Sequence, residues 1–168
     1  LLAAKPTGLS FETAAAVPMA ALTALQGLRD KGGIRAGQKV LIYGAGGGVG
    51  TFAVQIAKTC GAEVTALCSP RNVDLARSLG ADHVINYALE DFSARKEKYD
   101  LILGVNGNQP LGVYKRALAE KGIFVLVGGG LSQIFTTMLF GFFLSLGGKK
   151  MKFLAAKANI KDLALMIG

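Results

Sequence analysis

The part of the sequence with the clearest chemical meaning is a glycine-rich turn. Residues 39–43 (KVLIY) are almost entirely apolar and lead directly into GAGGGVG at 44–50. Apolar residues then recur at helical spacing through 49–60, which predicts an amphipathic helix. A strand, a glycine turn and a helix in this order bring free backbone N–H groups and the positive end of a helix dipole to one point. We therefore predict a phosphate-binding site at this turn.

The spacing of the glycines within this turn narrows the prediction to a dinucleotide. Ala45-x-Gly47-x-x-Gly50 is the dinucleotide-binding fingerprint, with alanine in place of its first glycine. Gly47 would let a pyrophosphate approach the backbone, and Gly50 would let the helix pack closely on its strand. A glycine triplet alone is weak evidence for a dinucleotide site, whereas a triplet set between a strand and a helix is specific evidence for one.

The rest of the chain alternates predicted strands with predicted helices. Strands are expected at 39–43, 63–68, 83–86, 100–103, 122–127 and 151–154. Helices are expected at 49–60, 72–79 and 110–119, with another that begins near Asn159. Strands that are apolar along their whole length indicate a parallel sheet covered by helices on both faces. We therefore predict an α/β fold with a doubly wound parallel sheet of about six strands, the Rossmann arrangement.

The helical segment that precedes the first strand contains a proline. Ser10 can cap a helix at its N-terminus, and Pro18 is expected to interrupt the helix before it resumes over 19–28.

Length and composition indicate a single domain. The chain has 168 residues, of which 51% are hydrophobic, enough for one compact core. It begins with Leu1-Leu2 and no methionine, so we expect a fragment, a processed chain or a trimmed chain. The net charge of +8 is spread along the sequence, which favours a solvated basic surface, or one that faces an acidic partner, over nucleic-acid binding.

Two further features bear on where the protein is found. Cys60 and Cys68 lack CxxC spacing, so we expect buried free thiols and a reducing, cytoplasmic setting. The first residues do not show the charged-then-apolar pattern expected of a signal peptide. The apolar run 134–146 contains 13 residues. A membrane-spanning helix needs about 20, so we expect a buried or interface segment and no membrane association.

The residues after the second predicted strand indicate which dinucleotide binds. An acid at this position would bind the ribose 2′-hydroxyl of NAD. Residues 67–72 read LCSPRN, without a carboxylate, and the nearest acid is Asp74 on the following helix. Ser69, Arg71 and Asn72 supply a hydroxyl, a guanidinium and an amide, and arginine binds phosphate through a planar fork of donors. The sequence therefore favours NADP(H). The alternative is that Arg71 is only a solvated surface residue.

Four motifs in order carry a resemblance to a known family. They are AAAVPMAALTA at 14–24, the GAGGGVG turn, LGADHVINY at 79–87 and KRAL at 115–118. From about residue 3 to its end, the chain resembles the medium-chain dehydrogenase/reductase superfamily, and within it the zinc-free quinone oxidoreductase (zeta-crystallin-like) branch. Members of this branch carry an N-terminal GroES-like domain that this sequence lacks, and they dimerise through the last strand of this domain, which would be 151–154 or its neighbours.

This resemblance implies a domain organisation and a set of cofactor contacts. Residues 1–168 would be one NADP-binding domain, in which 1–35 lead in from the missing catalytic domain and 131–168 hold the apolar segment, the sixth strand and the last helix. The contacts would be Gly47, Gly48, Val49 and Gly50 at the pyrophosphate, Thr23 at a phosphate or ribose, Ser69, Arg71 and Tyr87 around the 2′-phosphate, and Val105, Asn106, Val127 and Gly128 at the nicotinamide ribose. Ala45 of the turn and Asn72 beside Arg71 complete the set of residues that we expect to bind the cofactor.

Two departures from related patterns matter. Quinone reductases often place a lysine one position after Arg71, where this chain has Asn72 instead. Zinc alcohol dehydrogenases place a cysteine ligand where this chain has Met19, and a thioether binds zinc poorly. We therefore expect no zinc. His83, the single histidine, is expected to have a structural or surface role.

The resemblance implies hydride transfer from NADPH to a quinone, an enone or a related carbonyl, with the cofactor supplying the chemistry. No nucleophile–base pair can be assembled from this sequence, so no catalytic residue is named and the chain alone is expected to be inactive. Two alternatives remain: a non-enzymatic NADP-binding or sensor domain, and an enoyl reductase segment of a multidomain synthase.

Overall fold

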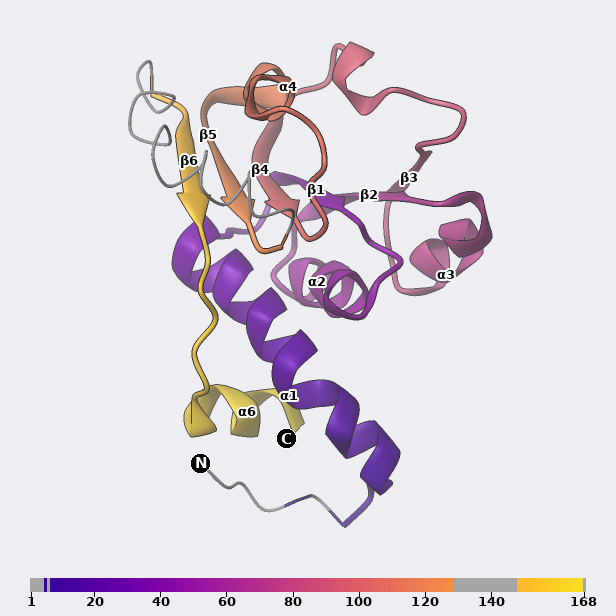
Figure 1. The fold of residues 1–168 in the computed structure, drawn as a ribbon, viewed down its shortest axis with the longest axis vertical. Helices are drawn as coiled ribbons and strands as arrows, with labels where there is room; N and C mark the ends of the chain where they lie inside the picture. The colour runs from indigo at the N-terminus through magenta and orange to yellow at the C-terminus, as the bar shows by residue number, and fades with distance from the viewer. Residues whose placement is uncertain (1–4, 6, 129–147, 168) are drawn as a thin grey trace.

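A parallel β-sheet forms the centre of the fold (Figure 1). The computed structural model describes residues 5, 7–128 and 148–167. Its strands are β1 (Lys39–Tyr43), β2 (Glu63–Cys68), β3 (His83–Asn86), β4 (Tyr99–Gly104), β5 (Leu118–Leu126) and β6 (Lys150–Phe153). All neighbouring strands pair in parallel, in the order β3-β2-β1-β4-β5-β6. The order reverses between β1 and β4, so the predicted doubly wound sheet is confirmed.

Helices cover both faces of this sheet (Figure 1). The helical elements are α1 (Phe11–Gln26), η1 (Gly27–Gly32), α2 (Gly48–Thr59), η2 (Pro70–Asn72), α3 (Val73–Ser78), η3 (Phe92–Ala94), α4 (Leu111–Ala117) and α6 (Ile160–Ile167). Buried side chains of α1, α2 and α3 share one core cluster with Val40 and Ile42 of β1. Those of η3 and α4 share the other with Leu41 and Tyr43. The two faces follow from the period-2 alternation of side chains along a strand.

The first helix corrects a prediction from the sequence. Ser10 caps it as expected, because its Oγ accepts a hydrogen bond of 3.2 Å from the backbone N–H of Thr13. Pro18 does not interrupt it, since α1 runs unbroken from Phe11 to Gln26. Proline removes one backbone donor. Burial of residues 21–26 compensates for that loss and keeps the helix continuous.

Two smaller predictions also change. β5 begins at Leu118, four residues before its predicted start, because the chain re-enters the sheet directly after α4 through an irregular pairing opposite Tyr99. Cys68 is buried as a free thiol, but Cys60 at the end of α2 is only half-buried. The apolar run 134–146 lies outside the described residues. Within the described ranges, none of the helices has the length and apolar character needed to cross a bilayer.

The last helix is fastened to the first by a buried carboxylate. Arg29 donates to both oxygens of Asp162, over 2.8 and 3.0 Å. The amide of Gln26 donates to the Lys157 carbonyl over 2.8 Å and accepts from the Lys157 N–H over 2.9 Å. Figure 1 shows α6 beside the part of α1 that extends beyond the sheet. This network therefore fixes residues 155–159 against α1.

We expect Asp162→Ala to lower the free energy of unfolding by about 1–3 kcal/mol. It removes, at a buried site, the acceptor of Arg29 and of Gln26 Nε2, which donates to Asp162 Oδ2 over 3.2 Å. The Arg29 guanidinium lowers the pKa of Asp162. The stabilisation is therefore present above the ordinary aspartate value of about 3.9 and is lost as the pH falls through the lower, folded-state value.

Urea denaturation of the parent chain and of the Asp162→Ala variant, between pH 7 and pH 3, measures the difference in the free energy of unfolding. Asp30→Ala is the matched control, because Asp30 also contacts Arg29, over 2.6 Å, but is exposed. It should change stability by less than about 1 kcal/mol. Equal losses in the two variants would show that the buried carboxylate has no special role.

Candidate nucleotide-binding site

The glycine turn has the geometry that the fingerprint predicts. The backbone N–H groups of Gly44 and Ala45 both donate to the Leu67 carbonyl over 3.0 Å, which ties the turn to β2. A Cβ on Gly50 would lie 2.7 Å from the Ala45 Cα, so only glycine lets α2 pack this closely on the turn. A Cβ on Gly47 would meet only the Gly44 carbonyl, at 3.7 Å. The space in front of Gly47 is therefore open to a ligand.

The helix that follows the turn adds positive polarity at the same point. α2 begins at Gly48, and its first amides have no acceptor within the helix. No acidic side chain stands in its first turn. Together with the helix dipole, these amides favour an anion such as a pyrophosphate.

Thr23 is buried on α1 and lines a hollow of about 390 Å³ between that helix and residues 156–158. Ala20, one turn earlier on α1, faces the glycine turn, because a Cβ added to Gly48 would lie 3.8 Å from the Ala20 Cβ. The expected contact of Thr23 with a cofactor remains a prediction.

The predicted 2′-phosphate residues lie together at the carboxyl ends of β2 and β3. These strands are neighbours, and the backbone N–H of Tyr87 donates to the Cys68 carbonyl over 3.2 Å, next to Ser69. The Arg71 side chain is exposed and makes no hydrogen bond or ion pair with another described residue. The nearest acid, Asp74, is paired with Arg77 over 3.4 Å. Arg71 is therefore available to a ligand.

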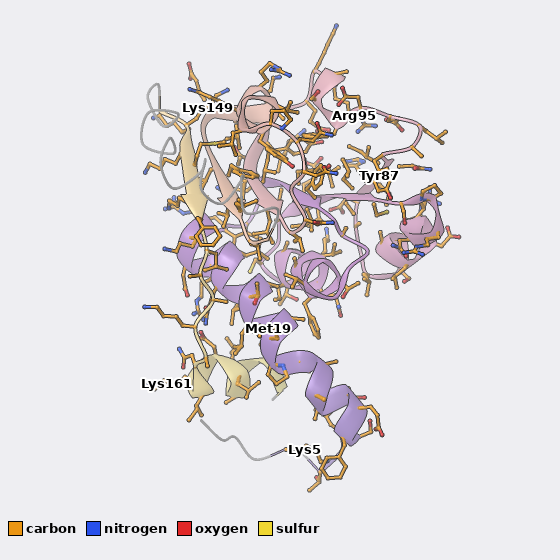
Figure 2. All side chains as sticks on the ribbon, viewed as in Figure 1. Lys5, Met19, Tyr87, Arg95, Lys149 and Lys161 are labelled. Carbon is orange, nitrogen blue, oxygen red and sulfur yellow. The ribbon has the colours of Figure 1, made fainter. Side chains whose placement is uncertain are left out.

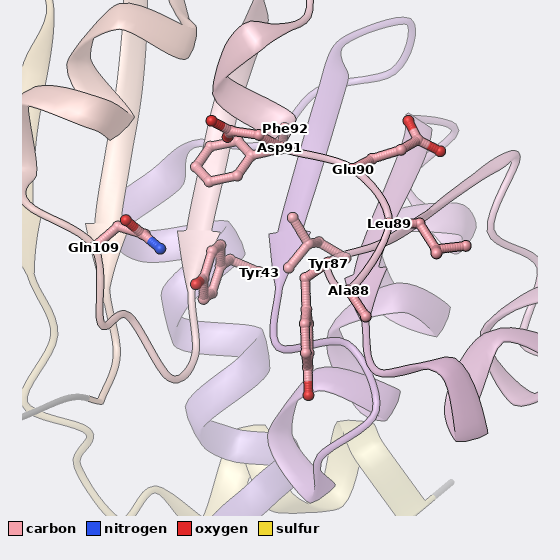
Figure 3. A pocket seen from close by; sticks show the side chains of 9 residues that line it. Tyr43, Tyr87, Ala88, Leu89, Glu90, Asp91, Phe92 and Gln109 are labelled. Atoms are coloured by element: carbon pink, nitrogen blue, oxygen red, sulfur yellow. The ribbon is translucent and has the colours of Figure 1, made fainter.

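Beside Tyr87 the structure adds residues that the sequence interpretation missed. Adjoining hollows of about 300 and 320 Å³ share the walls Tyr43, Leu67, Tyr87 and Gln109. Figure 3 shows the first of them. The Tyr43 hydroxyl donates to Asn108 Oδ1 over 2.6 Å, and burial raises the pKa of Tyr43, so the phenol stays neutral. Aromatic walls and amide groups suit a flat, hydrogen-bonding ring such as a nucleobase.

The sequence offered one signal for placing Tyr43 in the site: it is the last residue of the strand that precedes the fingerprint. Its ring is held by an edge contact with Tyr114, with centroids 5.5 Å apart.

The predicted nicotinamide-ribose residues also converge. Val105 follows β4 and donates its N–H to the Tyr43 carbonyl over 3.0 Å, whereas Val127 follows β5 and donates to the Gly104 carbonyl over 2.9 Å. A Cβ on Gly128 would lie 2.7 Å from the Val105 carbonyl oxygen, so the two loops touch. Asn106 is exposed beside them. All of these loops lie at the carboxyl edge of the sheet, where ligands of doubly wound folds bind.

Met19, which stands where zinc alcohol dehydrogenases place a cysteine ligand, is 78% exposed on α1 (Figure 2). The described part of the chain holds no group of three or more histidine, cysteine, aspartate or glutamate side chains placed to share a metal. His83 is exposed at the amino end of β3, with its Nε2 3.1 Å from Glu63 Oε1.

We expect elemental analysis of the dialysed protein to find much less than one zinc per chain, because a thioether at Met19 is a poor ligand. A stoichiometric zinc content that survives dialysis would contradict this prediction.

Comparison with known proteins agrees with this geometry. Residues 48–153 match the family profile described as zinc-binding dehydrogenase. A chloroplast envelope quinone oxidoreductase homolog from Arabidopsis thaliana is 37% identical over 141 residues, which cover 79% of this chain and 43% of the relative. The spectinabilin polyketide synthase system protein NorB from Streptomyces orinoci is 44% identical over 133 residues, covering 76% of this chain and 6% of that protein.

The fold is shared with a solved structure as well. The quinone oxidoreductase from Coxiella burnetii superposes with a TM-score of 0.81 at 31% identity, over 97% of this chain and 50% of that one. The chain thus spans half or less of the relatives it matches. These matches show that it belongs to the zinc-binding dehydrogenase family, within the medium-chain dehydrogenase/reductase superfamily of NAD(P)-dependent oxidoreductases, and is of the quinone oxidoreductase type.

Proposed function

We propose that this chain is the NADPH-binding domain of a reductase that transfers hydride to a quinone, an enone or a related conjugated carbonyl. The observation that carries the proposal is an open glycine turn next to an unpaired cation. Gly47 leaves space for a pyrophosphate, and Arg71 is exposed without an acidic partner in the described part of the chain. A site for NAD would place a carboxylate at this strand end.

The residues of this chain bind and orient the nucleotide. The amides of Gly48, Val49 and Gly50 at the start of α2 hold the pyrophosphate, and the loops after β4 and β5 hold the nicotinamide ribose. The bound cofactor supplies the hydride. No described side chain is assigned the role of proton donor.

Substrate binding is a property of the complete protein. Two of the relatives are named as quinone oxidoreductases, and this chain covers only 43% of one and 50% of the other. We propose that residues 1–168 form one nucleotide-binding domain, and that the substrate binds in a cleft between it and a GroES-like domain. The exposed side chain of Met19 on α1 would face that cleft.

A second candidate is an enoyl reductase segment of a multidomain synthase. The observation that favours it is the 44% identity to a polyketide synthase system protein, of which the aligned segment is only 6%. The reading frame around this chain distinguishes the two, because a synthase would encode carrier or ketoreductase sequence on either side.

We further propose a homodimer that forms through β6. This strand is the last in the sheet order and pairs on one side with β5, and none of the described strands pairs with its other edge, where a partner strand would add. A reducing, cytoplasmic setting is also part of the proposal and rests on the free thiols of Cys60 and Cys68.

Arg71→Ala tests the choice of nucleotide. We expect the variant to bind NADPH about 10- to 100-fold more weakly, because a charge-assisted contact contributes about 1.5–3 kcal/mol. Its affinity for NADH should be unchanged. Titrations that follow cofactor fluorescence measure both constants.

Arg77→Ala is the matched control, since it removes the same charge from an exposed arginine on α3. Equal affinity of the parent chain for the two nucleotides would overturn the assignment to NADPH.

A further inference from the structure

The fingerprint does not explain why residue 46 is a glycine. It occupies the variable position between Ala45 and Gly47, where the dinucleotide motif accepts any residue. Its φ is also not in the left-handed region, unlike that of Gly44 at +90°. Backbone conformation therefore does not require glycine at this position.

The side chain of Asn72 supplies the reason. A Cβ added to Gly46 would overlap it, at 2.6 Å from the Asn72 Cγ and 2.8 Å from its Cβ. Asn72 follows β2 and so reaches across from the neighbouring loop. It thus fills the space that a side chain at residue 46 would need.

Asn72 is turned toward this position although it stands at the start of a helix. Asparagine at an N-cap normally accepts a hydrogen bond from the backbone of the first turn, which contributes about 1 kcal/mol. Asn72 precedes α3 and Ser69 precedes η2, yet neither side chain caps its helix. Instead, Asn72 Nδ2 donates to Ser69 Oγ over 3.1 Å.

This hydrogen bond determines what Ser69 can offer a ligand. A hydroxyl has one proton and two lone pairs. Because the amide of Asn72 occupies a lone pair, the proton of Ser69 remains free to be donated. A phosphate ester presents acceptor oxygens, so a serine held as a donor beside Arg71 suits a 2′-phosphate better than an unconstrained hydroxyl does.

We propose that Asn72 is a positioning residue that orients the Ser69 hydroxyl toward the 2′-phosphate of NADPH, and that residue 46 is glycine to leave room for Asn72. This inference rests on the proposed binding of NADPH. It makes Gly46, Asn72 and Ser69 one unit that determines nucleotide preference.

The test compares single and double variants of the 168-residue chain by titration with NADPH and NADH. Asn72→Ala should weaken NADPH binding by about tenfold, the effect of one neutral hydrogen bond, and leave NADH binding unchanged. Gly46→Ala should produce the same selective loss, because the new methyl group displaces Asn72. Thermal unfolding followed by circular dichroism confirms that each variant folds.

The double variants carry the decisive result. In an Asn72→Ala background, both Gly46→Ala and Ser69→Ala should weaken NADPH binding by less than about twofold, because residues that act as one unit are not additive. Fully additive losses would overturn the proposal. So would a Gly46→Ala variant that loses NADPH and NADH equally, since that would assign Gly46 to the pyrophosphate.

The outcome also separates this inference from the proposed function. If the parent chain prefers NADPH but the double variants are additive, only the positioning role fails. If the parent chain does not prefer NADPH, both fail.

Discussion

Gly47→Val is expected to bind neither NADPH nor NADH while keeping the parental fold. The valine side chain would occupy the open space where a pyrophosphate must approach the turn, because a Cβ there meets no atom closer than 3.7 Å. The backbone at Gly47 is extended, with φ −90° and ψ 169°, which valine adopts readily. We expect the affinity for both nucleotides to fall at least about 100-fold, which corresponds to about 2.7 kcal/mol.

Calorimetric titration and thermal unfolding measure the two halves of this prediction. Gly112→Val is a suitable control, because Gly112 is exposed on α4 and a Cβ there would meet only the end of the Arg116 side chain, at 3.9 Å. It should bind both nucleotides like the parent. A folded Gly47→Val variant with parental affinity would show that the turn is not the binding site.

Gly50→Ala is expected to affect folding rather than binding alone. The added methyl group would lie 2.7 Å from the Ala45 Cα and 2.8 Å from its carbonyl carbon, and these backbone atoms belong to the turn that joins β1 to α2. Overpacking against backbone forces the helix away from the sheet. We expect the free energy of unfolding to fall by about 3 kcal/mol, which lowers the melting temperature of a domain of this size by roughly 6–12 °C.

Gly48→Ala is the matched control for this variant. The same substitution there meets only the Ala20 Cβ, at 3.8 Å, and lies within the first turn of α2. Its stability should stay within about 0.5 kcal/mol of the parent. A Gly50→Ala variant as stable as the Gly48→Ala variant would show that α2 can shift away from the turn without loss.

The sequence alone predicted the secondary structure well where the signal is local. β1, β2 and β3 have the predicted boundaries, and α2 lies within one residue of its predicted range. These elements are short apolar runs or one-sided helices bounded by glycine, so neighbours in the sequence determine them. The continuous helix through Pro18 was mispredicted because burial of its second half is a tertiary effect.

The glycine fingerprint and the missing acid after β2 also follow from sequence, because both depend on residue type at fixed spacing. They were sufficient to predict the fold class and a dinucleotide site. The contacts with individual cofactor groups, from Thr23 to Gly128, remain predictions.

Tertiary structure alone decided which distant residues meet. It placed Asn72 against Gly46, Asn108 on the Tyr43 hydroxyl and Asp162 on Arg29. Such contacts depend on the order of parallel strands and on how loops at their ends pack. Neither property is revealed by a periodic pattern or a local motif in the sequence. Periodicity and turn chemistry therefore determined the elements, whereas the packing of those elements determined which polar side chains are paired and which, like Arg71, make no pair with another described residue.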